Sequence, residues 1–198
     1  MPRARLGSAA VTEAGASLAD EIGVGQLSMG LVAERVGVKT PSLYKHVGGL
    51  ADLTYRIAVL AMGELGDCVR DAAQGRAGTD ALIAVARAMR MYVKEHPGRY
   101  RATNIVTPGG PEDPFVVASD RLLRSLAAVL HGYRISPAEE IHALRMLRSM
   151  LHGFVTLELE DGFRLGVDAS ESFDWMINTI DHALRFTYDR DGRPSRLK

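Results

Sequence analysis

Residues 28–47 read SMGLVAERVGVKTPSLYKHV and predict two short helices joined by a tight turn. Ser28 can accept a hydrogen bond from the free N–H groups of a first helical turn, and the apolar residues after it recur at helical spacing. Gly37 follows the last of them, and glycine readily adopts the left-handed conformation that ends many helices. Thr40 and Pro41 then fit the cap and the first position of a second helix. The stretch therefore predicts a helix-turn-helix.

The second helix separates apolar from polar side chains. Leu43 and Val47 fall on one face, whereas Ser42, Tyr44 and Lys45 point elsewhere. Polar side chains on the second helix of such a pair suit contacts to the base edges and phosphates of a DNA duplex. An ordinary helical hairpin on a solvated surface accounts for the same spacing, so the pattern alone leaves both interpretations open.

The run from Val32 to Leu53, VAERVGVKTPSLYKHVGGLADL, resembles the DNA-binding signature of the TetR family of bacterial one-component repressors. The matching residues are Ala33, Gly37, Val38, Leu43, Tyr44, His46 and Leu53. Two positions depart from the pattern, because Val47 replaces the usual aromatic residue and Leu50 replaces a lysine. In the family that lysine contacts a backbone phosphate at the start of the fourth helix. We expect the contact to be lost here, or to be made by backbone N–H groups around Gly48 and Gly49.

The resemblance and the helix geometry together assign eight residues to the DNA surface. Lys45 is expected at a phosphate or a guanine, Tyr44 at a phosphate or a thymine methyl group, and Ser42 at a nearby base or phosphate. His46 is expected near the DNA backbone and Lys39 where the helix begins. The predicted DNA-binding residues are Ser28, Lys39, Thr40, Pro41, Ser42, Tyr44, Lys45 and His46.

Composition limits the other possibilities. The 198 residues, 46% of them hydrophobic, are enough for one DNA-binding unit and a larger helical unit. Lys and Arg total 24 against 24 Asp and Glu, so any attraction to DNA must come from a local surface. The one cysteine, Cys68, is expected to be a buried or half-buried thiol, and no Cys/His cluster has metal-site spacing. No apolar run approaches the roughly 18 residues that span a bilayer, so we expect a cytoplasmic protein without a membrane segment.

Apolar residues recur at helical spacing along the whole chain, and no stretch keeps the two-residue period of a half-buried strand. We therefore predict an all-α fold. The resemblance implies that it is TetR-like, with about nine helices in an N-terminal three-helix unit and a C-terminal bundle. Ser136-Pro137-Ala138-Glu139 has the form of a capping box, which predicts a long helix from Ser136 towards Asp161. Asp168 and Glu171 indicate the start of a last helix. The predicted domains are residues 1–49 for DNA binding, 50–188 for ligand binding and dimerisation, and a disordered tail at 189–198.

Two C-terminal segments resemble the WHG subgroup of the family. These are HPGRYRATN at 96–104 and MLHGFVTLELEDGF at 150–163, where Leu151 replaces the usual tryptophan. In the family, the last two long helices pair with their copies in a homodimer, which implies a pseudo-palindromic operator. The alternative is that both helices only complete the core of a monomer. Gly153 lies in mid-helix, where glycine costs up to about 1 kcal/mol against alanine, so we expect it to allow close approach of another helix or of a ligand.

A sensor for a small organic effector is the function that the resemblance implies for the central helices. Apolar and adaptable side chains with a few polar tips suit such a pocket, although a plain hydrophobic core explains the same residues. The predicted ligand-binding residues are Met89, Tyr92, His96, Phe115, Leu122, Leu126, Met146 and Met150. Effector binding would favour a conformation whose recognition helices are wrongly spaced for DNA, and the protein would then be a repressor released by its ligand.

Two other functions compete with this one. A constitutive DNA-binding protein would keep the helix-turn-helix and lack the sensor. An enzyme would need an acid–base pair such as His152 with Glu158, or Asp181 with His182. Residues six apart on a helix point in separate directions, and adjacent residues do not face each other. No nucleophile elbow or phosphate loop appears either, so we predict no catalytic residue, no metal site and no cofactor.

Overall fold

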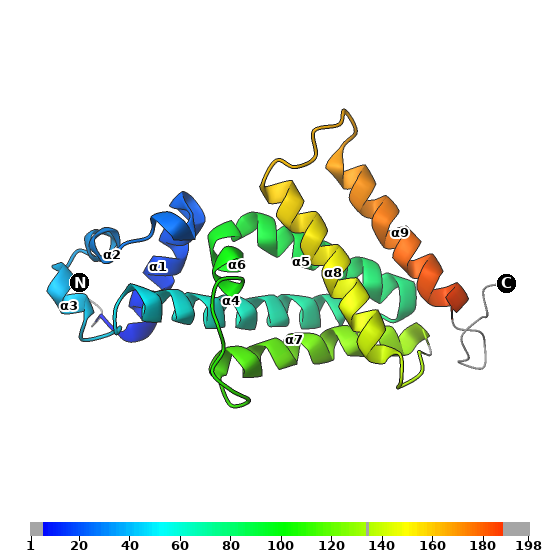
Figure 1. Ribbon diagram of the computed structural model, residues 1–198, viewed down its shortest axis with the longest axis horizontal. Coiled ribbons are helices and arrows are strands. Elements are labelled where there is room, and N and C mark those ends of the chain that lie inside the picture. Colours follow the sequence, from blue (N-terminus) through cyan, green and yellow to red (C-terminus); the bar gives the residue numbers. More distant parts are fainter. Residues whose placement is uncertain (1–5, 134, 188–198) are drawn as a thin grey trace. The chain divides into compact units, whose positions relative to one another are not determined.

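The computed structural model describes residues 6–133 and 135–187, and these residues form nine α-helices and two short 3-10 helices with no strand (Figure 1). The predicted all-α fold is confirmed. The predicted disordered tail, residues 189–198, lies outside the described residues. In chain order the elements are α1 (Ser8–Ile22), η1 (Val24–Gln26), α2 (Met29–Arg35), α3 (Thr40–Leu43), α4 (Leu50–Ala73), α5 (Gly78–Glu95), α6 (Pro97–Thr103), α7 (Pro114–Leu130), η2 (His131–Tyr133), α8 (Glu140–Leu159) and α9 (Ala169–Thr187).

The chain divides into two compact units. Unit 1 comprises the residues up to 64 together with 95–119, and unit 2 comprises 65–94 and the residues from 120 onwards. Unit 1 therefore holds α1 to α3, α6 and the first parts of α4 and α7, whereas unit 2 holds most of α5 and all of α8 and α9. The domain boundary predicted after residue 49 is a functional division and remains a prediction.

Unit 1 is held together by helices that pack closely at two glycines. Gly15 in α1 lies against α4, since a Cβ there would be 3.2 Å from the methyl carbons of Leu53. Gly98 in α6 lies against α1, since a Cβ there would be only 2.0 Å from the carbonyl oxygen of Ala19. Their buried side chains form one apolar core with those of α2 and α3. The buried members are Val11, Ala16, Leu18, Leu27, Met29, Val32, Ala33, Leu43, Val47, Leu53, Ile57, Ala58 and Ala102.

In unit 2, α8 and α9 are antiparallel neighbours (Figure 1). Phe154 of α8 and Phe173 of α9 meet edge to face, with ring centroids 5.1 Å apart. The guanidinium of Arg90, from α5, lies 4.8 Å from the centroid of Phe173 and pairs with the carboxylate of Glu158. An aromatic contact, a cation–π contact and a largely buried ion pair therefore join α5, α8 and α9.

Two helix starts in unit 2 were predicted from capping residues, with different outcomes. Asp168 caps α9 as expected, because its Oδ1 accepts the Ser170 N–H at 2.8 Å. The capping box at Ser136 was wrong, since α8 begins only at Glu140. The Glu139 N–H donates to the backbone carbonyl of Ser136 at 2.9 Å, whereas the Ser136 hydroxyl donates to the Glu139 carboxylate at 2.8 Å. The backbone therefore forms a turn here, and the two side chains bind each other instead of capping the helix.

Cys68 also differs from expectation, because we expected a buried or half-buried thiol and the residue is exposed. Its neighbours in α4, Leu65 and Val69, occupy the buried stripe of the helix. Cys68 lies one position before Val69, so its side chain leaves the helix in a direction away from that stripe.

Candidate nucleic-acid interface

The turn between α2 and α3 has the geometry that the sequence predicts (Figure 1). Ser28 caps α2, since its Oγ accepts the Leu31 N–H at 3.3 Å. Gly37 has φ +70°, and its N–H donates to the Glu34 carbonyl at 3.1 Å. The Val38 N–H reaches back to the Ala33 carbonyl at 3.0 Å. This pair of bonds is a Schellman motif, which ends α2 and turns the chain into α3.

The second helix is shorter than predicted and begins one residue earlier. α3 covers only Thr40–Leu43, with Lys39 as its N-cap and no side-chain capping bond, so the assignment of Thr40 as the cap was wrong. The Ser42 N–H donates to the Lys39 carbonyl at 2.8 Å, which closes the first turn on Lys39. Residues 44–46 continue as a turn, in which the Val47 N–H still bonds to the carbonyl of Leu43.

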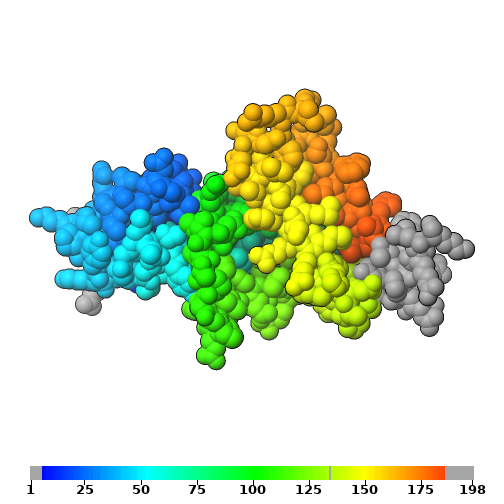
Figure 2. Space-filling view, viewed as in Figure 1, coloured from blue at the N-terminus to red at the C-terminus, as the bar shows by residue number. Residues whose placement is uncertain are grey.

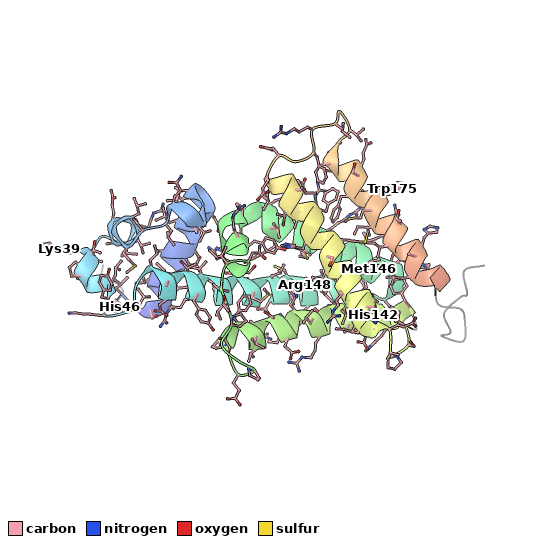
Figure 3. All side chains as sticks on the ribbon, viewed as in Figure 1. Lys39, His46, His142, Met146, Arg148 and Trp175 are labelled. Carbon is pink, nitrogen blue, oxygen red and sulfur yellow. The ribbon has the colours of Figure 1, made fainter. Side chains whose placement is uncertain are left out.

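The predicted separation of faces on this element is confirmed. Leu43 is fully buried and Val47 is 3% exposed, so both anchor the element on the core of unit 1. Tyr44 is 58% exposed, and Lys39 and Lys45 are also exposed (Figure 3 labels Lys39). Of the other predicted DNA residues, Pro41 is exposed, and Ser28, Thr40, Ser42 and His46 are half-buried. All eight residues reach the surface of unit 1, and their contacts to DNA remain a prediction.

Arg35 is not an unpaired cation at this surface. Its Nη1 donates to Glu21 Oε1 at 2.8 Å and its Nη2 to Glu21 Oε2, so the two side chains pair in a fork. The hydrogen bonds from Arg35 lower the pKa of the Glu21 carboxyl group. Glu21 in α1 and Arg35 in α2 are 14 positions apart, so no local sequence pattern predicted this ion pair. We refer to residues 28–47 as the α2–α3 element. Lys39 and Lys45 therefore carry its remaining exposed positive charge, and its basic character is modest.

The start of α4 offers a different environment from the one expected. The Gly48 N–H donates to Asp52 Oδ2 at 2.7 Å, so this amide is not available for a phosphate, and that part of the expectation was wrong. The same carboxylate oxygen accepts Arg56 Nε at 2.9 Å. The bond from Gly48, followed by the contact with Arg56, lowers the pKa of Asp52. An acidic residue in the first turn of a helix can be recognised in the sequence. Here the Asp52 carboxylate takes the place of an external anion at the α4 N-terminus.

Arg99 of α6 ties three helices of unit 1 together. Its guanidinium reaches Glu13 Oε1 at 2.6 Å, Asp20 Oδ2 at 2.9 Å and Glu64 Oε1 at 2.8 Å. The Arg99 backbone N–H also donates to Asp20, and His96 Nδ1 lies 3.2 Å from the same carboxylate. We refer to Arg99, Glu13, Asp20 and Glu64 as the Arg99 cluster. It links α6 to α1 and α4, and its members lie too far apart in the sequence to be paired by inspection.

The eight predicted ligand-binding residues fall in both units. His96 and Phe115 belong to unit 1, where His96 contacts Asp20 and Phe115 packs on the edge of the core. In unit 2, Met89, Tyr92 and Leu126 are buried, and Leu122, Met146 and Met150 are half-buried (Figure 3 labels Met146). Their burial fits either a core or a pocket wall, so their role remains a prediction.

Comparison with known proteins decides the family. Residues 82–180 match the model of the tetracyclin repressor-like C-terminal domain. The chain is 32% identical over 181 residues to the HTH-type transcriptional regulator YobS of Bacillus subtilis (strain 168), which covers 90% of this chain and 93% of that protein.

The chain belongs to the TetR family of transcriptional regulators.

A second relative and a solved TetR structure agree with this assignment. The HTH-type transcriptional regulator Rv0681 of Mycobacterium tuberculosis (strain ATCC 25618 / H37Rv) is 30% identical over 174 residues, 88% of this chain and 79% of that protein. The crystal structure of a TetR variant from Acinetobacter baumannii AYE in complex with minocycline has the same fold, with a TM-score of 0.67 at 20% identity over 90% of this chain and 96% of that chain. As a member of the TetR family, the protein is a DNA-binding transcriptional regulator and not an enzyme. The resemblance to the WHG subgroup remains a prediction.

The described part of this TetR-family chain offers neither a membrane span nor a metal site. None of its helices combines the length and the apolar character needed to cross a membrane. Within residues 6–133 and 135–187, no three His, Cys, Asp or Glu side chains are grouped as a metal site would require.

Proposed function

We propose that this regulator is a repressor that binds a pseudo-palindromic operator as a homodimer and leaves it when a small organic effector binds. The observation that carries the proposal is the separation of faces on α3 and the turn after it. Buried Leu43 anchors this segment on the core, and Tyr44 and Lys45 are exposed and can contact the duplex. In a helix-turn-helix the second helix lies in the major groove, and a dimer reads two half-sites about 34 Å apart.

The proposed DNA surface consists of the eight residues predicted from the sequence. Tyr44 and Lys45 contact bases or phosphates, and the side chain of Lys39 reaches the phosphates beside the start of α3. Because Arg35 is paired with Glu21 and the Gly48 amide with Asp52, few charged phosphate contacts remain on the described residues 28–48. Binding should accordingly depend on salt only moderately, since each phosphate contact releases roughly one counterion.

The proposed dimer forms through α8 and α9, whose outer faces lie at the surface of unit 2 (Figure 2). Ile141 on α8 and Trp175 on α9 are exposed to 50% and 72%, and the proposed dimer would cover these large apolar side chains (Figure 3 labels Trp175). Gly153 supports the same proposal, because no atom outside its own helix lies within 4 Å of a Cβ built on it. The close approach expected at this glycine is therefore absent from the described chain, and a second copy or a ligand would supply it.

The proposed sensor lies in the C-terminal domain, residues 50–188, and uses the predicted ligand-binding residues. The solved TetR variant in complex with minocycline supports a pocket for a small organic molecule in this fold. The methionines Met89, Met146 and Met150 would let the walls adapt to the effector. Each of the eight assignments is part of the proposal.

The operator is tested by selecting bound duplexes from a random DNA pool with the full chain. We expect an inverted repeat whose half-site centres are one helical turn, or a multiple of it, apart. Lys45→Ala should then weaken binding to all sequences alike and lower the salt slope by about one, if Lys45 contacts only phosphate. Arg124→Ala is the matched control, because Arg124 is an exposed cation of unit 2. Selection of unrelated sequences without symmetry would refute the proposed dimer on DNA.

The sensor is tested separately, once the operator is in hand. Compounds that raise the melting temperature of the protein are added at saturating concentration to the operator complex, and release of DNA is followed by fluorescence anisotropy. We expect release by a compound whose binding is lost in Met150→Glu. If saturation of that site leaves the operator affinity unchanged, the protein is a constitutive DNA-binding protein instead.

A further inference from the structure

A second candidate binding site lies in unit 1. It is a pocket of about 850 Å³ between the first half of α1 and α4, with Pro114 at the start of α7 also in its wall. Its volume falls in the range of small-molecule sites, roughly 300–1,000 Å³, and its wall is mostly apolar. None of the proposed DNA-binding or ligand-binding residues lines it. The pocket therefore shares no lining residue with either of the sites proposed above.

Arg56 is the hydrogen-bond donor that organises the polar side of this pocket. Its Nε donates to Asp52 Oδ2 at 2.9 Å and its Nη1 to Ser8 Oγ at 2.9 Å, and all three residues line the pocket. No bond from Arg56 Nη2 is seen among the described residues. The guanidinium, which has five N–H donors, can therefore still donate to an occupant.

The charges in the wall are matched within unit 1. Asp52 pairs with Arg56, and Glu13 pairs with Arg99 at 2.6 Å. An anionic occupant would meet Asp52 and Glu13 in the same wall as Arg56. A cationic one would meet Arg56 and carboxylates that are already paired. The wall therefore favours an occupant without net charge, because neither sign finds an unpaired partner there.

We propose that this pocket is a second small-molecule site, which takes a neutral, largely apolar organic molecule carrying a carbonyl or hydroxyl oxygen. The oxygen accepts a hydrogen bond from Arg56, and the apolar part of the molecule lies against Tyr55, Val59 and Leu60. Occupancy has a consequence at the α2–α3 element. The Asp52 carboxylate accepts hydrogen bonds both from Arg56 and from the Gly48 N–H, which comes directly after that element. An occupant that accepts a hydrogen bond from Arg56 therefore changes the surroundings of the Gly48 amide.

The test uses the full chain and a neutral fluorescent ketone, 6-propionyl-2-(dimethylamino)naphthalene, as the probe. Its affinity is measured by fluorescence titration, and its position is mapped from backbone amide shifts in TROSY spectra. Ala9→Trp fills the pocket from an exposed position in the first turn of α1. Ala128→Trp is the matched control, because Ala128 is an exposed helical alanine of unit 2 that does not line this pocket.

We expect amide shifts at residues 8–13 and 52–60 and at Gly48. The affinity should fall about tenfold or more in Ala9→Trp and stay within about twofold in Ala128→Trp. Arg56→Met should also weaken the probe, by the loss of one charge-assisted hydrogen bond. The proposal is overturned if the probe does not bind, if its shifts are confined to unit 2, or if Ala9→Trp binds it as well as the unmodified protein does. None of these outcomes depends on the operator or on the effector of the proposed function.

Discussion

Replacing Arg99 by methionine tests how unit 1 is held together. The Arg99 side chain is 8% exposed and pairs with Asp20, Glu64 and Glu13, whose side chains are 13%, 31% and 53% exposed. Methionine keeps most of the length and apolar volume of the side chain and removes the charge. The substitution therefore leaves Asp20 as a largely buried carboxylate without its cation, while Glu13 can turn to solvent.

Removing one partner of a buried ion pair costs about 3–5 kcal/mol, because the other charge stays buried. Asp20 keeps hydrogen bonds from the Arg99 backbone N–H and from His96, so we expect the lower end of this range, about 3 kcal/mol. That is a large part of a typical stability of roughly 5–15 kcal/mol. The measurement is urea unfolding at a fixed protein concentration. With a slope of about 1–3 kcal/mol per molar urea, the midpoint should fall by roughly 1–3 M.

Arg87→Met provides the matched control. Arg87 pairs with Asp174 in unit 2, but both side chains are more than half exposed, so its loss should cost at most about 1 kcal/mol. If Arg99→Met is no more destabilising than Arg87→Met, the Arg99 cluster does not stabilise unit 1 and the reasoning from burial is refuted.

Three further changes have expected outcomes that simple measurements can check. Gly98→Ala places a Cβ 2.0 Å from a backbone carbonyl of α1 and should cost about 1–3 kcal/mol in urea unfolding, whereas Gly63→Ala, with open space at its Cβ, should gain up to about 1 kcal/mol; equal effects would contradict the packing of α6 on α1. Arg90 lowers the pKa of Glu158, so this pair stabilises the fold fully above the pKa of an unfolded glutamate, roughly 4.3, and its contribution is lost as the pH falls through the lowered pKa of the folded state. Glu158→Gln should flatten that acid limb of the stability curve, and an unchanged limb would exclude the pair as its cause. Gly153→Ala should weaken the proposed homodimer in analytical ultracentrifugation if α8 packs closely on a second copy, and an unchanged dissociation constant would argue against an interface at Gly153.

The sequence predicted the elements whose interactions are local. The caps at Ser28 and Asp168 and the turn at Gly37 join residues at most five positions apart, and all three are present. The split between buried Leu43 and exposed Tyr44 follows from helix periodicity alone. Local signals failed where two local bonds compete, as at Ser136, whose backbone carbonyl accepts the Glu139 N–H in place of its hydroxyl.

Only the tertiary structure decided which charges remain available at the proposed DNA surface and which pockets exist. Arg35 and Arg99 look like any other arginines in the sequence, yet one is paired with Glu21 and the other joins carboxylates up to 86 residues away. The pocket beside Arg56 likewise depends on how α1 lies on α4, which Gly15 and the side chains of the core determine. The physical reason is range: capping and periodicity act within about one helical turn, whereas ion pairs and cavities depend on the positions of whole helices, which the packing of the core sets.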